Sequence, residues 1–165
     1  MNLLLETTSN SSGSQANKTG NALESFVEGI LERNGYTEFI NHKKQIFFMK
    51  EFIGGKQFSK QSKCGKSIYD TDRRCDFLVM NPAKHPRGLI IECKWQETSG
   101  SVDEKYPFAV LNIAKIGTPT IVLIDGKGYK QKAFEWFKKQ AAHEQALRGV
   151  YTMNEFQKLV NRGFL

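Results

Sequence analysis

Two apolar, strand-like runs that carry ionised residues constrain this chain more than any other feature. The run "RCDFLVMN" (residues 74–81) contains Asp76, and "LIIECKW" (residues 89–95) contains Glu92 and Lys94. Between them, "PAKHPRG" has the prolines and glycine of a turn, so we expect a β-hairpin. A charge on a buried strand costs several kcal/mol unless something compensates it. A metal ion and a phosphate would compensate all three charges.

The alternation of side chains along a strand gives these charges a common direction. Glu92, Lys94 and Gln96 point to one face of their strand and Cys93 to the other, and the simplest hairpin register brings Asp76 towards Glu92. Two carboxylates that close repel each other unless a cation lies between them. Carboxylate oxygens, with the backbone carbonyl of Cys93 as a further ligand, favour Mg²⁺, with Mn²⁺ as a substitute. With Lys94 to orient a water or hold charge on a phosphate, the pattern predicts phosphodiester hydrolysis.

The beginning of the chain predicts a flexible arm followed by one domain. Residues 9–20 are rich in Ser, Asn and Gly, so we expect an N-terminal arm over residues 1–20 and a single domain over residues 21–165. Leucine, valine and isoleucine then recur at helical spacing up to Leu31. Asn21 is a plausible N-cap of this helix, and Gly35 a plausible stop.

The remaining segments alternate between strand and helix signals. We expect the following elements: a strand over residues 45–53, a polar basic loop over 54–67, a helix from about Asp103 with Pro107 in its first turn, a buried strand over 118–124, a long helix over 130–148, and a final helix with Thr152 and Glu155 in capping-box register. Strand, helix and strand in succession favour a parallel crossover. The predicted fold class is α/β, with one mixed sheet and helices on both faces.

Asp76 followed by Glu92-Cys93-Lys94 resembles the motif of the PD-(D/E)XK nuclease superfamily, which contains type II restriction endonucleases. Cys75 stands where the motif has proline. The resemblance implies a restriction-endonuclease-like fold, a mixed central sheet flanked by helices. It also implies that Glu24, on the first helix, joins the catalytic and metal-binding set, and that Gln96 of "ECKWQ" lies near the metal. "SGSVDEKYPF" and "VLIDGKGYKQKAFEWFKKQ" are similar to restriction-type members.

The resemblance implies a Mg²⁺-dependent DNA endonuclease, sequence-specific and of restriction type, from a bacterium, phage or mobile element. Two other functions stay open: a structure-specific nuclease that cuts DNA junctions, and a non-cleaving DNA-binding protein on the same scaffold. Single residues also have structural alternatives. Asp76 could pair with Arg73 or Arg74, Glu92 and Lys94 could be a surface ion pair, Glu24 could complete a capping box with Asn21, and Gln96 could be an ordinary strand-end amide.

The charge balance favours a polyanionic partner. The net charge is +7, and residues 43–74 alone carry +6, from nine Lys or Arg against three Asp or Glu. A double-strand break at a symmetric sequence requires two sites, which predicts a homodimer on double-stranded DNA. The predicted DNA contacts are Lys56, Gln57, Lys60, Lys63, Lys66, Arg73, Arg74 and Lys105.

Several other classes of protein do not match the sequence. No apolar run approaches the ~20 residues that cross a bilayer, and the N-terminus lacks a signal-peptide pattern, so we expect a cytoplasmic protein without a membrane partner. "CGKS" lacks the first glycine of a phosphate-binding loop, so no nucleotide cofactor is expected. The three cysteines contain no CxxC pair, which argues against a disulfide framework or a structural zinc site.

Overall fold

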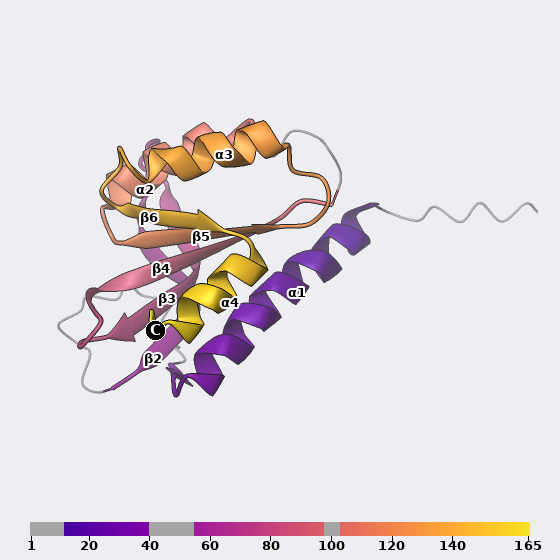
Figure 1. Cartoon of the computed structure of the whole chain (residues 1–165). Helices are drawn as coiled ribbons and strands as arrows, with labels where there is room; N and C mark the ends of the chain where they lie inside the picture. Colours follow the sequence, from indigo (N-terminus) through magenta and orange to yellow (C-terminus); the bar gives the residue numbers. More distant parts are fainter. Residues whose placement is uncertain (1–11, 40–54, 98–102) are drawn as a thin grey trace, which may run out of the picture.

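A mixed six-stranded sheet with helices on both faces forms the structure (Figure 1). The computed structural model describes residues 12–39, 55–97 and 103–165, with side chains from residue 22 onward. The strand order is β1-β2-β3-β4-β5-β6, antiparallel for β2–β3 and β3–β4 and parallel elsewhere. This confirms the predicted fold class. The described elements are α1 (Ser12–Arg33), β1 (Thr37–Glu38), β2 (Gln57–Lys66), β3 (Asp72–Asn81), β4 (His85–Trp95), α2 (Lys105–Ile116), β5 (Thr120–Asp125), α3 (Gln131–Gln140), β6 (Leu147–Tyr151) and α4 (Met153–Asn161).

The sheet divides the core into two layers. Figure 1 shows α1 and α4 on one face and α2 and α3 on the other. On the first face, Leu23 and Val27 of α1 pack in one buried cluster with Phe77 and Ile91 of the hairpin. On the second face, α2 and α3 pack on the alternate side chains of β5 and β6. Burial of both faces explains why β5 and the middle of β4 are apolar without a polar side.

The predicted hairpin is confirmed by β3 and β4. Its register pairs Phe77 with Ile91 and Val79 with Leu89. The turn is shorter than the proline-rich segment indicated, because β4 already begins at His85. The hairpin thus places the run that holds Asp76 beside the run that holds Glu92 and Lys94.

The crossover after the hairpin also follows the sequence. Pro107 lies in the first turn of α2, where its missing N–H breaks no helical hydrogen bond, and Gly117 ends the helix with φ of 74°. β5 then runs parallel to β4. At the C-terminal end of the chain, Thr152 and Glu155 form the predicted capping box of α4.

The first helix is longer than the sequence indicated. α1 begins at Ser12 rather than at Asn21, so residues 12–20 of the predicted arm are helical. Serine, asparagine and glycine are weak helix formers, but extending an existing helix avoids the cost of nucleation. Asn21 lies inside the helix and is not its N-cap.

A strand, β2, replaces the predicted basic loop. Gln57–Lys66 pairs antiparallel with β3 along its length. Of its apolar residues only Phe58 is deeply buried, and the buried hydroxyls of Ser59 and Ser62 satisfy each other at 2.6 Å. Hydrogen bonds to β3, rather than apolar alternation, hold the segment extended, which is why its composition indicated a loop.

The predicted helix over residues 130–148 is in fact a helix and a strand. α3 ends at Gln140, and Leu147–Tyr151 forms β6, which pairs parallel with β5. Leu147 and Val150 are buried in the cluster under α2 and α3. The strand predicted over residues 45–53 lies outside the described residues. No helix among the described residues is both long and apolar enough to cross a bilayer.

Candidate active site

The candidate site lies where β3 and β4 separate. Their last paired residues are Phe77 and Ile91. Beyond this point β3 pairs only with β2, through Cys75, while β4 pairs only with β5, through Glu92. The hairpin therefore opens into a fork, and Asp76 is the first residue of β3 past the last pair.

Asp76 bridges this fork with its carboxylate. Its Oδ2 accepts a hydrogen bond from the Cys93 backbone N–H at 2.7 Å, and its Oδ1 accepts one from Gln61 Nε2 at 3.1 Å. Charge-assisted bonds of this length are the stronger class of hydrogen bond in proteins. The bond to Cys93 brings Asp76 next to the Glu92-Cys93-Lys94 segment, although the two strands no longer pair there.

Glu92 is held between two cations. Its side chain is buried (the residue is 7% exposed), and its oxygens lie 3.4 Å from Arg73 Nη2 and 3.6 Å from Lys94 Nζ. Arg73 therefore pairs with Glu92, and none of the described contacts joins Arg73 to Asp76. The two positive charges compensate the cost of burying this carboxylate, which accounts for a charged residue on an otherwise apolar strand.

Glu24 approaches the same region from α1. Burial raises the pKa of Glu24, and the negative charge of Asp76 raises it further, against a lowering effect of Lys60. Because α1 begins at Ser12, Glu24 lies well inside the helix and cannot cap it with Asn21. The capping alternative for Glu24 is therefore wrong, and its carboxyl group is available to the fork.

Four of the five predicted catalytic residues are charged, and the charges of all four act on the Cys93 side chain. Burial raises the pKa of its thiol, as do the charges of Asp76, Glu24 and Glu92, while Lys94 lowers it. These charges are therefore close enough to act on the same position of β4. Cys93 itself contributes a backbone N–H, and its side chain packs towards α1.

Gln96 has a different environment from the other predicted residues. It is 2% exposed, its Nε2 donates to the Gly128 carbonyl at 3.1 Å, and its Oε1 accepts from the Tyr106 hydroxyl at 3.2 Å. Burial and the nearby Asp103 raise the pKa of Tyr106 to about 12, so this hydroxyl stays a donor. These contacts tie the end of β4 to α2 and to the loop after β5, and they favour a positioning role for Gln96.

The predicted DNA contacts fall into two groups. Most of these side chains already have a partner within the protein. Three form ion pairs: Lys60 with Glu28 and Glu38, and Lys63 and Lys66 with Asp72. Lys56 and Arg74 donate to the carbonyl groups of Asn34 and Gln61, and Gln57 is half-buried in β2. Lys63 and Lys66 lower the pKa of Asp72 to about 2. Only Arg73 and Lys105, of the eight, line a groove beside Lys94.

This groove has a volume of about 320 Å³ and is lined by cations and aromatic side chains. Trp95 and Phe108 form part of its wall, and Tyr69, 72% exposed, stacks on Phe108 with ring centroids 5.5 Å apart. Sequence reasoning missed these rings, because Phe108 on an amphipathic helix indicates core packing and no local pattern brings Trp95 of β4 or Tyr69, between β2 and β3, to its side. Gln61 and Tyr106 were missed as partners of Asp76 and Gln96, because no local signal marks a contact between distant elements.

The donor atoms of the fork fit a hard divalent cation. Asp76 and Glu92 offer carboxylate oxygens, and one or two carboxylates with waters suffice to bind Mg²⁺. Burial raises the pKa of Glu24 and the charge of Asp76 raises it further, and a cation would offset the second of these effects. Among the described residues, no three Asp, Glu, His or Cys side chains lie close enough together to form a metal-binding group.

A family model of the PD-(D/E)XK nuclease superfamily domain matches residues 15–164. The chain belongs to the PD-(D/E)XK nuclease superfamily. Members of this superfamily usually use divalent metal ions, and a nuclease domain acts on nucleic acid. The resemblance drawn from Asp76 and Glu92-Cys93-Lys94 is therefore confirmed at the level of the superfamily. Neither the curated proteins nor the solved structures gave a match.

Proposed function

We propose that this nuclease-superfamily protein is a Mg²⁺-dependent endonuclease that hydrolyses phosphodiester bonds in DNA, with Mn²⁺ as a substitute metal. One observation carries the proposal: the hydrogen bond from the Cys93 N–H to Asp76, which joins the separated strands at the catalytic motif. This bond supports the proposal because it joins Asp76 of β3 to the backbone of the segment that carries Glu92 and Lys94, and a bound metal and a phosphate would compensate these charges.

Asp76 and Glu92 would hold the metal, with the Cys93 carbonyl as a further ligand and Glu24 as an additional acidic group. When bound, the metal would polarise the phosphoryl group and acidify a water. Glu92 would then exchange part of its contact with Arg73 and Lys94 for the metal. Both cations would become available to the negatively charged substrate, at the groove that they already line.

Lys94 would act on the attacking water and the phosphate. As an ammonium it can only donate hydrogen bonds, so it would orient the water oxygen and stabilise charge on the non-bridging oxygens. Hydrolysis forms one bond from the water oxygen to phosphorus and breaks the bond to the leaving sugar oxygen. The water loses a proton and the sugar oxygen gains one. Arg73 and Lys105 would hold the neighbouring phosphates.

Three finer features belong to the same proposal. We infer that the substrate is double-stranded DNA, that cleavage is sequence-specific and of restriction type, and that two chains associate to cut both strands. The net charge of +7 supports a polyanionic substrate. A monomeric mass in gel filtration, both with and without DNA, would refute the homodimer.

A cleavage assay with matched variants tests the proposal. The protein would be incubated with plasmid, linear duplex and four-way-junction DNA in Mg²⁺, in Mn²⁺ and in EDTA, beside Asp76→Asn, Lys94→Ala and the control Lys132→Ala, an exposed lysine of α3. We expect discrete fragments that require metal, vanish in the first two variants and persist in the control. Cleavage of the four-way junction alone would show a structure-specific nuclease and refute the restriction-type specificity. No product on any substrate would refute the nuclease.

A further inference from the structure

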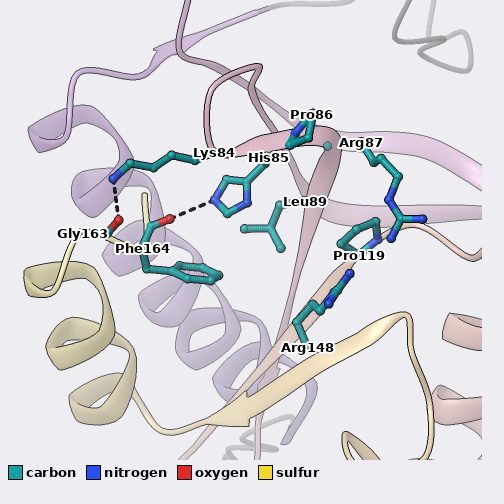
Figure 2. A pocket seen from close by; sticks show the side chains of 10 residues that line it. Lys84, His85, Pro86, Arg87, Leu89, Pro119, Arg148, Gly163 and Phe164 are labelled. Atoms are coloured by element: carbon teal, nitrogen blue, oxygen red, sulfur yellow. Dashed lines mark hydrogen bonds between the residues drawn. The ribbon is translucent and has the colours of Figure 1, made fainter.

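A second cavity lies at the opposite end of β4 from the fork (Figure 2). Its volume is about 660 Å³, and its lining comes from the start of β4, the loop before β5, the start of β6 and the C-terminal tail. Leu89, in its lining, precedes Lys94 by five residues, which corresponds to roughly 17 Å along a strand. The cavity is therefore separate from the candidate active site. No Asp or Glu lines it.

Two arginines without a counter-charge face this cavity. Arg87 of β4 and Arg148 of β6 lie on either side of Pro119, as Figure 2 shows. Neither forms an ion pair or a side-chain hydrogen bond with any described residue. Other cations have a carboxylate oxygen 3.6 Å away or nearer, namely Lys60, Lys63, Lys66, Arg73, Lys94, Lys115, Lys130 and Lys138.

Such an arrangement points to an anion. Like charges that share a cavity repel, and an anion between them turns this repulsion into attraction. Guanidinium groups match phosphate oxygens through paired hydrogen bonds, which lysines do not offer. The surface between Arg87 and Arg148 therefore has the chemistry of a phosphate site.

The opposite wall of the cavity is apolar and held in place. His85 donates from Nε2 to the Phe164 carbonyl at 3.0 Å, and the two rings lie 5.1 Å apart. Lys84 Nζ donates to the carbonyl oxygens of Gly163 and Leu165, so the tail is fixed at two further points. Phe164 thus presents a positioned ring near Leu89, opposite the arginines (Figure 2).

We propose that this cavity binds a nucleotide unit of a nucleic-acid strand away from the cleavage site. The phosphate lies between Arg87 and Arg148, and the base packs against the partly buried ring of Phe164. An aromatic face beside a basic groove is the arrangement by which proteins hold single strands without reading their sequence. The proposal rests on nucleic acid being the ligand of this protein, but not on cleavage.

Fluorescence anisotropy with a labelled single-stranded hexanucleotide tests this site, in EDTA so that no cleavage occurs. The variant Arg87→Ala/Arg148→Ala is compared with Arg33→Ala/Arg162→Ala, which removes two exposed arginines outside the cavity. We expect the cavity variant to weaken binding at least tenfold relative to the control. The slope of log K against log salt should fall by about 0.7, because the variant loses one phosphate contact and each such contact on a single strand contributes about 0.7.

The outcomes separate this proposal from the nuclease proposal. Equal binding by the two double variants would overturn the cavity site, whatever the cleavage assay shows. Displacement of the strand by nucleoside monophosphate at an equal concentration of nucleotide units would make a free nucleotide the ligand and overturn the strand assignment. If the alanine variant does not fold, as judged from its thermal unfolding, Arg87→Gln/Arg148→Gln repeats the comparison without removing the side-chain stems.

Discussion

Asp76 has two roles that a pair of substitutions can separate. Its carboxylate supplies negative charge to the fork, and it also accepts the hydrogen bond that joins Cys93 of β4 to β3. Asp76→Asn removes the charge and keeps an oxygen for the Cys93 N–H. Asp76→Ala removes both. We expect both variants to lose cleavage, and only Asp76→Ala to lose substantial stability.

The size of the difference follows from the hydrogen bond. Exchanging a charged acceptor for a neutral one costs about 1 kcal/mol, whereas leaving a partly buried N–H unpaired costs about 2–3 kcal/mol. Both variants remove the same repulsion from Glu24, so this term cancels between them. The Ala variant should therefore be about 1–2 kcal/mol less stable than the Asn variant. For a chain of this length that corresponds to about 2–8 °C in Tm.

Thermal unfolding followed by circular dichroism, beside the cleavage assay, measures both effects. Asp70→Asn is the matched control, because Asp70 is an exposed carboxylate at a turn where asparagine also tolerates the positive φ of 58°. Equal Tm values for the Ala and Asn variants would show that the Asp76–Cys93 bond does not hold the fork. Wild-type cleavage by Asp76→Asn would show that the charge is not needed.

Three further predictions follow from the same region. Because burial and Asp76 raise the folded-state pKa of Glu24 above 4.5, its charged form opposes folding. Glu24→Gln should therefore raise Tm at pH 7 but not below pH 4.5, and should lower cleavage; a Tm difference that is constant over this pH range would contradict the account. Gln96→Leu leaves the Gly128 carbonyl and the Tyr106 hydroxyl without their partner, at about 1–3 kcal/mol each. We expect a lower Tm, with cleavage retained at temperatures well below that Tm. Loss of cleavage in a variant that is still folded would instead give Gln96 a direct role. Phe108→Ala should weaken nucleic-acid binding in EDTA at least about fivefold, as the loss of one base stack would; the same loss in Trp136→Ala, an exposed aromatic of α3, would argue against a local contact.

The sequence predicts the centre of this fold better than its edges. The hairpin of β3 and β4, the α2 crossover and β5 combine apolar runs with turn residues, so local pattern and tertiary structure agree there. β2 and β6 are defined by their neighbours instead. β2 is polar and pairs with β3, and β6 continues a segment with helical periodicity but pairs with β5. Sequence patterns do not record which neighbour a segment will find.

The candidate site shows the same division. The charges on two apolar strands were visible because they break a local rule, and such breaks are expected at functional sites. The opening of the hairpin past Phe77 and Ile91 was not visible. Simple alternation placed Asp76 opposite Glu92, whereas the described contacts join Asp76 to the Cys93 N–H and Glu92 to Arg73. Partners that come from separate strands, as Gln61 does, depend on the register and cannot be read locally.

The contact between Asp76 and Cys93 also determines which substitutions the motif tolerates. Residue 93 contacts Asp76 through its backbone N–H, while its side chain packs on the core cluster that includes α1 and the residue also lines the groove beside Lys94. An apolar residue of similar volume would keep both the backbone N–H and the packing, so we expect the position between Glu92 and Lys94 to tolerate such substitutions. The thiol, whose pKa burial and the surrounding charges raise, stays protonated and resists alkylation. Thiol-directed labels should therefore react with an introduced surface cysteine before they react with Cys93.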